Sequence, residues 1–134
     1  MFTTMHITMF VHDQDATVDF YKKLGFVVQT DINLENAQRS IDNRRWLTLC
    51  LPNVTGFELV LMKATTEIER SLVGKQGGDN SPLITLETDD CYKECQRLQD
   101  LGIDILGKPE VKPWGICMYF NDNSGNEIYV IQHI

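Results

Sequence analysis

The 134-residue chain lacks the features that define several common protein classes. It has no excess of basic residues, since the net charge is −7 and the sequence pI about 4.8, whereas a nucleic-acid-binding domain needs a basic face. No apolar run is long enough to span a bilayer, and residues 1–12 lack the basic start and long apolar stretch of a signal peptide. The composition therefore predicts a cytoplasmic protein with no nucleic-acid partner and no membrane partner.

Cysteine and glycine motifs are also missing. The four cysteines, Cys50, Cys91, Cys95 and Cys117, show no CxxC spacing, so we expect reduced, partly buried thiols rather than a zinc site. No phosphate-binding glycine loop follows a predicted strand, and no Ser-His-Asp or Cys-His nucleophile pattern is present. The chain is instead 43% apolar and of ordinary domain length, which predicts one compact domain with a real core.

An internal repeat organises the sequence. Val11–Phe26 matches Thr88–Ile103 without a gap at an offset of 77 positions, and the turn glycines Gly56 and Gly125 match at an offset of 69. Each half predicts the order β-α-β-β-β, and neither half can bury its sheet face alone. We therefore expect an α+β fold in a single domain over residues 1–134, with module one at about 4–63, a connection at about 64–82 and module two at about 83–132.

Apolar alternation and capping residues predict the elements of these modules. Asp13 or Asp15 is expected to cap the first helix and Asp89 or Asp90 the second. Lys108–Trp114, which contains two prolines, predicts a loop. The predicted strands are Met5–Val11, Phe26–Thr30, Arg45–Leu51, Phe57–Met62, Leu83–Thr88, Ile103–Leu106, Gly115–Phe120 and the arm after Gly125; the helices end near Leu24 and Leu101, a short turn of helix lies near Ile68–Val73, and Asp31–Arg45 is a polar surface loop.

The V-x-D…F-Y-x-x-L-G-F run at Val11–Phe26, the duplicated module and the closing hairpin NDNSGNEIYVI at Asn121–Ile131 carry a family likeness. Together they resemble the vicinal oxygen chelate superfamily, which includes glyoxalase I, bleomycin-resistance proteins and extradiol dioxygenases. The likeness covers about residues 4–132. It implies tandem βαβββ modules whose curled mixed sheets surround a cavity, and it implies a homodimer.

The resemblance also implies where a metal ion would bind. In metal-dependent members four ligands come from equivalent strand positions, which correspond here to His6, Val60, Leu83 and Tyr129. Only the histidine is an ordinary ligand, because a neutral phenol must ionise from a pKa near 10, and a divalent cation needs three or four suitable donors. We therefore expect no metal and no other cofactor. A shifted site that uses His6 with Glu58 or Glu127 is the alternative.

Strand parity predicts two unlike sheet faces. One mixes His6, Glu58, Glu127 and Tyr129 with apolar side chains, which is typical of a small-molecule pocket with a few polar anchors. The alternative is a face that is solvated or buried in a dimer. The other face is apolar and is expected to lie under the helices: Ile7, Met9, Val11, Leu59, Leu61, Ile84, Leu86, Ile128 and Val130.

These patterns favour a bleomycin-resistance-like protein that binds a small organic molecule without metal and sequesters a toxic compound. A metal-dependent lyase or dioxygenase with a rearranged site, and a structural or regulatory homodimer without a small ligand, are the alternatives. The sequence leaves open whether a reaction is catalysed; His6, Glu58 and Glu127 are the candidate catalytic groups. The indoles can line a pocket rim or pack in the core. The candidate ligand-binding residues are His6, Trp46, Glu58, Trp114, Glu127 and Tyr129.

Overall fold

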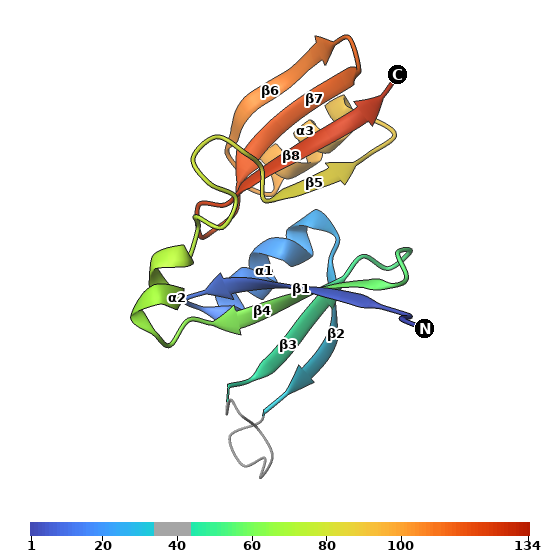
Figure 1. The fold of residues 1–134 in the computed structure, drawn as a ribbon. Coiled ribbons are helices and arrows are strands. Elements are labelled where there is room, and N and C mark those ends of the chain that lie inside the picture. The colour runs from blue at the N-terminus through green and yellow to red at the C-terminus, as the bar shows by residue number, and fades with distance from the viewer. Residues whose placement is uncertain (34–43) are drawn as a thin grey trace. The chain divides into compact units, whose positions relative to one another are not determined.

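The computed structural model describes residues 1–33 and 44–134, which form two compact units, Met1–Gly74 and Lys75–Ile134 (Figure 1). Their boundary falls inside the connection expected at 64–82, while the packing of both units as one domain stays a prediction. The order β-α-β-β-β recurs in both units, which confirms the duplicated α+β architecture. Unit one contains β1 (Met5–Val11), α1 (Gln14–Leu24), β2 (Val27–Ile32), β3 (Trp46–Cys50), β4 (Phe57–Lys63) and α2 (Glu67–Leu72); unit two contains β5 (Ile84–Glu87), α3 (Cys91–Asp100), β6 (Ile105–Lys112), β7 (Gly115–Asn121) and β8 (Glu127–His133).

The two sheets have the same topology. Their strand orders are β1-β4-β3-β2 and β5-β8-β7-β6, and in each the first pair is parallel while the other pairs are antiparallel. Ile7 lies opposite Leu59 in the first parallel pair, and Ile84 lies opposite Ile128 in the second. These partners differ by the two offsets read from the sequence, so the repeat holds residue by residue.

Side-chain caps start both long helices. Asp13 accepts a hydrogen bond from the Ala16 amide at 3.0 Å, and Asp90 accepts one from the Lys93 amide at 3.0 Å. Each carboxylate satisfies an amide that has no partner within its helix. The structure therefore selects Asp13 and Asp90 from the two pairs of candidates.

Helix α1 covers one face of the sheet in unit one (Figure 1). It buries Thr17, Val18 and Tyr21, and the Tyr21 ring meets Phe26 edge-on with ring centroids 5.4 Å apart. The Gln14 amide reaches across to donate a hydrogen bond to the Leu61 carbonyl at 2.9 Å. The helix therefore joins the sheet through apolar packing and through one buried polar contact.

The apolar face predicted for the first strand is only partly covered. Met9 and Val11 are buried, but Ile7 is 45% exposed. The reason is that burial in β1 is confined to the end that leads into α1, as the exposed residues before Met9 show. The prediction that Ile7 lies under a helix was wrong.

The loop predicted over Lys108–Trp114 was also wrong, because β6 continues to Lys112. Proline has no amide hydrogen to donate to a neighbouring strand, which is why Pro109 argued against a strand. Strand β6, however, is at the edge of its sheet, and its register with β7 shifts between Gly107 and Glu110. An edge strand with such an irregularity tolerates proline.

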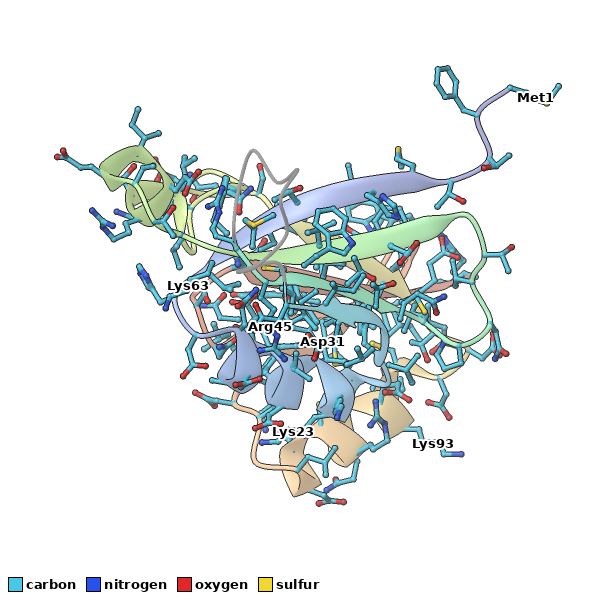
Figure 2. All side chains as sticks on the ribbon, turned by 90° about the horizontal axis from the view of Figure 1, so that it is seen from below. Met1, Lys23, Asp31, Arg45, Lys63 and Lys93 are labelled. Atoms are coloured by element: carbon cyan, nitrogen blue, oxygen red, sulfur yellow. The ribbon has the colours of Figure 1, made fainter. Side chains whose placement is uncertain are left out.

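The prediction of a polar surface loop at Asp31–Arg45 was wrong for Asp31 and Ile32, which continue β2. Arg45 holds Asp31 through two hydrogen bonds of 2.8 Å, as Figure 2 shows by their adjacent positions. The remainder of that prediction, residues 34–43, lies outside the described part of the chain. The short helical turn expected near residues 68–73 is confirmed by α2.

An aspartate stabilises the turn of the closing hairpin. Asp122 accepts hydrogen bonds from the Ser124 and Asn126 amides, both at 2.9 Å. Gly125 then adopts a φ of 94°, a left-handed conformation that side chains disfavour. This turn directs β8 back along β7 and sets the register of the predicted site residues on β8.

Candidate functional site

A chain of polar side chains crosses three strands of unit one. His6 on β1 lies directly opposite Glu58 on β4, and its Nε2 is 2.7 Å from Oε2 of that glutamate. Thr48 on β3 donates its hydroxyl to the other oxygen, Oε1, also at 2.7 Å. Thr48 is 1% exposed and is therefore fixed by its surroundings. We call this arrangement the Thr48–Glu58–His6 chain.

The carboxylate of Glu58 is held in its charged form. The hydrogen bond from Thr48 lowers the pKa of Glu58 most, the hydrogen bond with His6 lowers it further, and burial opposes both. An ionised carboxylate only accepts hydrogen bonds. The nitrogen of His6 that faces Glu58 therefore carries the hydrogen.

An aromatic ring completes this face. The rings of Trp46 and His6 form a T-shaped pair, with ring centroids 6.1 Å apart and an interplanar angle of 79°. The structure thus brings three of the candidate ligand-binding residues, His6, Trp46 and Glu58, into one cluster. It also adds Thr48, which the sequence reasoning missed although its spacing from Trp46 placed both on one face of a strand.

Unit two brings two other candidates together. Hydrogen bonding with Cys117 raises the pKa of Tyr129, burial also raises it, and hydrogen bonding with Trp114 acts in the opposite direction. Trp114 is 56% exposed beside this tyrosine. Glu127 lies at the start of β8 opposite Asn121 and, among the described residues, no side-chain hydrogen bond or ion pair joins it to the other candidates.

The end of β8 carries a further acid–imidazole pair. Nε2 of His133 is 2.8 Å from Oε1 of Glu87, and both side chains are exposed. They line a hollow of about 480 Å³ together with Thr88, Asp89 and Gln132. The sequence analysis did not reveal the pairing of His133 with Glu87, because it depends on strand β8 ending beside β5.

The metal-binding positions implied by the resemblance do not fit a divalent cation. Val60 and Leu83 offer only hydrocarbon, and the raised pKa of Tyr129 opposes ionisation of its phenol. His6 already uses Nε2 in its bond with Glu58, and both oxygens of that glutamate have partners. Across residues 1–33 and 44–134, no group of three or more His, Cys, Asp or Glu side chains is arranged to hold a metal ion.

The duplicated modules agree with the result of sequence comparison. The profile of the Glyoxalase/Bleomycin resistance protein/Dioxygenase superfamily matches residues 4–130. The chain belongs to this superfamily. In the described ranges, 1–33 and 44–134, no helix has the length and apolar character required to cross a membrane.

One relative and two solved structures are similar to this chain over most of its length. An uncharacterized protein of Shewanella frigidimarina (strain NCIMB 400) is 30% identical over 123 residues, covering 91% of this chain and 87% of the relative. The crystal structure of UcmS2 has a TM-score of 0.77 and 28% identity, covering 96% of both chains. The structure of TnmS3, an antibiotic binding protein from Streptomyces sp. CB03234, has a TM-score of 0.72 and 27% identity, covering 98% of this chain and 95% of that one.

Proposed function

We propose that this protein binds a small organic molecule on the face of unit one that carries His6, Trp46 and Glu58. The observation that carries the proposal is the Thr48–Glu58–His6 chain, in which each carboxylate oxygen of Glu58 has a hydrogen-bond partner. A half-exposed imidazole fixed in this way, beside an indole, combines an oriented polar anchor with an apolar wall. Small-molecule sites are built from such combinations.

The likeness to TnmS3 supports a binding role. That protein is named for antibiotic binding, and the present chain shares its fold over nearly its whole length. We propose that sequestration of a toxic compound is the purpose of binding here, and that Trp114, Tyr129 and Glu127 are ligand contacts in unit two. The net charge of −7 supports a small molecule rather than a nucleic acid as the partner.

We propose that binding needs no metal ion or other cofactor. The support is chemical: two of the four family positions are hydrocarbon, and the histidine at a third is committed to Glu58 through Nε2. A lyase or dioxygenase that depends on a cation would require three or four donors in place of these groups.

We further propose that the protein is a cytoplasmic homodimer. The support for self-association is a set of exposed apolar side chains on β1, β2 and β4 of unit one. Light scattering coupled to size exclusion gives the mass directly, and a monomer at micromolar concentration would contradict this part of the proposal. The side chains concerned are Met5, Ile7, Val27, Ile32 and Phe57.

Thermal unfolding against a panel of planar organic compounds tests the binding role. A compound at a hundred times its dissociation constant stabilises the folded protein by about 2.7 kcal/mol, which raises Tm by several degrees. The rise should be lost in Trp46→Ala and His6→Ala but kept in His12→Ala, which alters an exposed histidine outside the cluster. A Tm indifferent to every compound would contradict the proposal.

The same protein preparation tests the absence of a metal. Elemental analysis and melting curves in Ni²⁺, Zn²⁺, Mn²⁺, Fe²⁺ and chelator should show no stoichiometric metal and no stabilisation. A bound cation that His6→Ala removes would make the metal-dependent enzyme the better explanation. Loss of the cation in His12→Ala as well would instead indicate nonspecific surface binding.

A further inference from the structure

We infer that the site takes ligands with an aromatic hydroxyl group, a phenol, whose O–H donates to Nδ1 of His6 while its ring lies beside Trp46. This inference rests on the proposed function, because it specifies the chemistry of the molecule that binds there. It follows from which atoms of the Thr48–Glu58–His6 chain are already used and which one is not.

The direction of each hydrogen bond in the chain is determined by its central member. The Glu58 carboxylate accepts from Thr48 at Oε1 and from Nε2 of His6 at Oε2, both at 2.7 Å. A neutral imidazole carries one hydrogen, so when it lies on Nε2 the other nitrogen, Nδ1, has a bare lone pair. In its neutral form, His6 is therefore a hydrogen-bond acceptor toward anything outside the Thr48–Glu58–His6 chain.

Nδ1 is also available for a ligand. The His6 side chain is 42% exposed, and no described residue forms a hydrogen bond with Nδ1. A molecule beside it must therefore present a hydrogen-bond donor, because an ether or carbonyl oxygen would face a lone pair. An unmatched pair of acceptors costs binding free energy, so the site selects against ligands without a donor.

The charges around the site decide which donor fits. Glu58 is anionic and the chain carries −7 overall, which disfavours a carboxylate ligand that brings a second negative charge. A phenol enters neutral, and the pair of phenol and imidazole can share its proton without adding net charge. The indole of Trp46, which lies next to His6, gives the aromatic ring of the ligand a surface on which to pack.

The repeat does not reproduce this acceptor at the corresponding position of unit two. The register that places His6 opposite Glu58 places Leu83 at the corresponding position in unit two, where its amide donates to the Glu127 carbonyl at 2.9 Å. A leucine side chain cannot orient a hydrogen bond. Both units thus share the strand pairing and a glutamate at this position, but the imidazole that orients the hydrogen bond is replaced by leucine in unit two.

Three matched probes test the inference on the full-length protein: 4-hydroxyacetophenone, 4-methoxyacetophenone and 4-acetylbenzoate. They share a ring and differ in the group that meets Nδ1, which is a donor, a methyl ether or an anion. Quenching of tryptophan fluorescence gives the affinities, and the absorption band of the bound phenol reports how far its proton has moved toward His6. We expect 4-hydroxyacetophenone to bind at least tenfold more tightly than the other two probes.

Glu58→Gln distinguishes recognition from a structural role. The glutamine amide can donate to Nε2, which moves the imidazole hydrogen to Nδ1 and makes that atom a donor. The preference for the phenol over the anisole should then fall to about one or reverse, while Tm and the circular dichroism spectrum show that the protein remains folded. Glu67→Gln changes an exposed carboxylate outside the cluster and should keep the full preference.

The outcomes separate the two levels of the proposal. Equal affinities for phenol and anisole, or a phenol preference that survives Glu58→Gln, would refute the inference while leaving small-molecule binding intact. Tight binding of 4-acetylbenzoate would refute the charge argument and with it the choice of a phenol. If no probe binds and the wider compound panel also leaves Tm unchanged, the proposed function itself fails.

Discussion

Replacing Thr48 with valine isolates the hydrogen bond that begins the Thr48–Glu58–His6 chain. Valine has nearly the shape of threonine, so the packing of this buried position changes little while the hydroxyl is lost. Oε1 of Glu58 then loses the donor that is 2.7 Å away. The change therefore tests the chain without altering any group that we expect to touch a ligand.

The size of the effect follows from the exposure of Glu58. A hydrogen bond to a charged group contributes roughly 1.5–3 kcal/mol to stability. The Glu58 side chain keeps 20% of its surface in solvent, so water replaces part of the lost bond. We therefore expect Thr48→Val to lower the free energy of unfolding by about 1.5 kcal/mol, which corresponds to a fall in Tm of roughly 5 °C.

The direction of the Glu58 pKa shift determines how the stability loss depends on pH. The pKa of Glu58 is lowered in the folded protein, so its stabilisation is present above the ordinary carboxyl pKa and is lost as the pH falls through the folded value. The difference in Tm between wild type and Thr48→Val should be full at pH 7 and shrink below about pH 4. Calorimetry at both pH values measures it.

Two results would refute this reasoning. A loss below about 0.5 kcal/mol at pH 7 would mean that Thr48 contributes no more than an ordinary surface substitution. A loss of the same size at pH 3 and pH 7 would mean that packing, not the charged hydrogen bond, explains it. Thr48→Ser, which keeps the hydroxyl and removes a methyl group, is the control and should retain the pH dependence.

Three further predictions concern the fold and the site. Gly107→Ala should cost about 1 kcal/mol in chemical denaturation, because a Cβ there would lie 2.0 Å from the Tyr119 ring, and Gly107→Ala should cost less in a Tyr119→Ala background. Asp13→Ala should lower stability by about 1 kcal/mol through loss of the helix cap, whereas the exposed Asp19→Ala should change it little. Dialysis against a chelator should leave both Tm and the affinity for 4-hydroxyacetophenone unchanged, and a fall in either that added Zn²⁺ reverses would contradict the metal-free site.

The strands and helices could be predicted from the sequence where local chemistry decides them. Asp13 and Asp90 cap helices because a carboxylate bonds an amide three residues away, and this depends on no distant residue. The strand Met5–Val11 was predicted with its observed bounds by alternation alone. The β6 strand was missed because the penalty for Pro109 depends on whether a neighbouring strand needs its amide, and only the edge position of β6 answers that.

The sequence predicted those features of the candidate site that depend on the alternation of side chains along a strand. Alternation placed His6 and Glu58 on the same kind of face, but it could not show that their strands pair in parallel with these two residues opposite one another. Thr48 was missed for the same reason, since its hydroxyl matters only because β3 lies beside β4 and the side chain reaches Glu58.

The sequence by itself determined the duplicated βαβββ module, its helix caps and the superfamily to which the chain belongs. These follow from short-range spacing and from the repeat, both of which can be read from the order of residues alone. Only the tertiary structure decided which nitrogen of His6 carries its hydrogen, because that depends on a charged oxygen 52 residues away in the chain and 2.7 Å away in space. Hydrogen bonds act over a few ångströms, so the arrangement of the Thr48–Glu58–His6 chain was settled by strand pairing rather than by residue order.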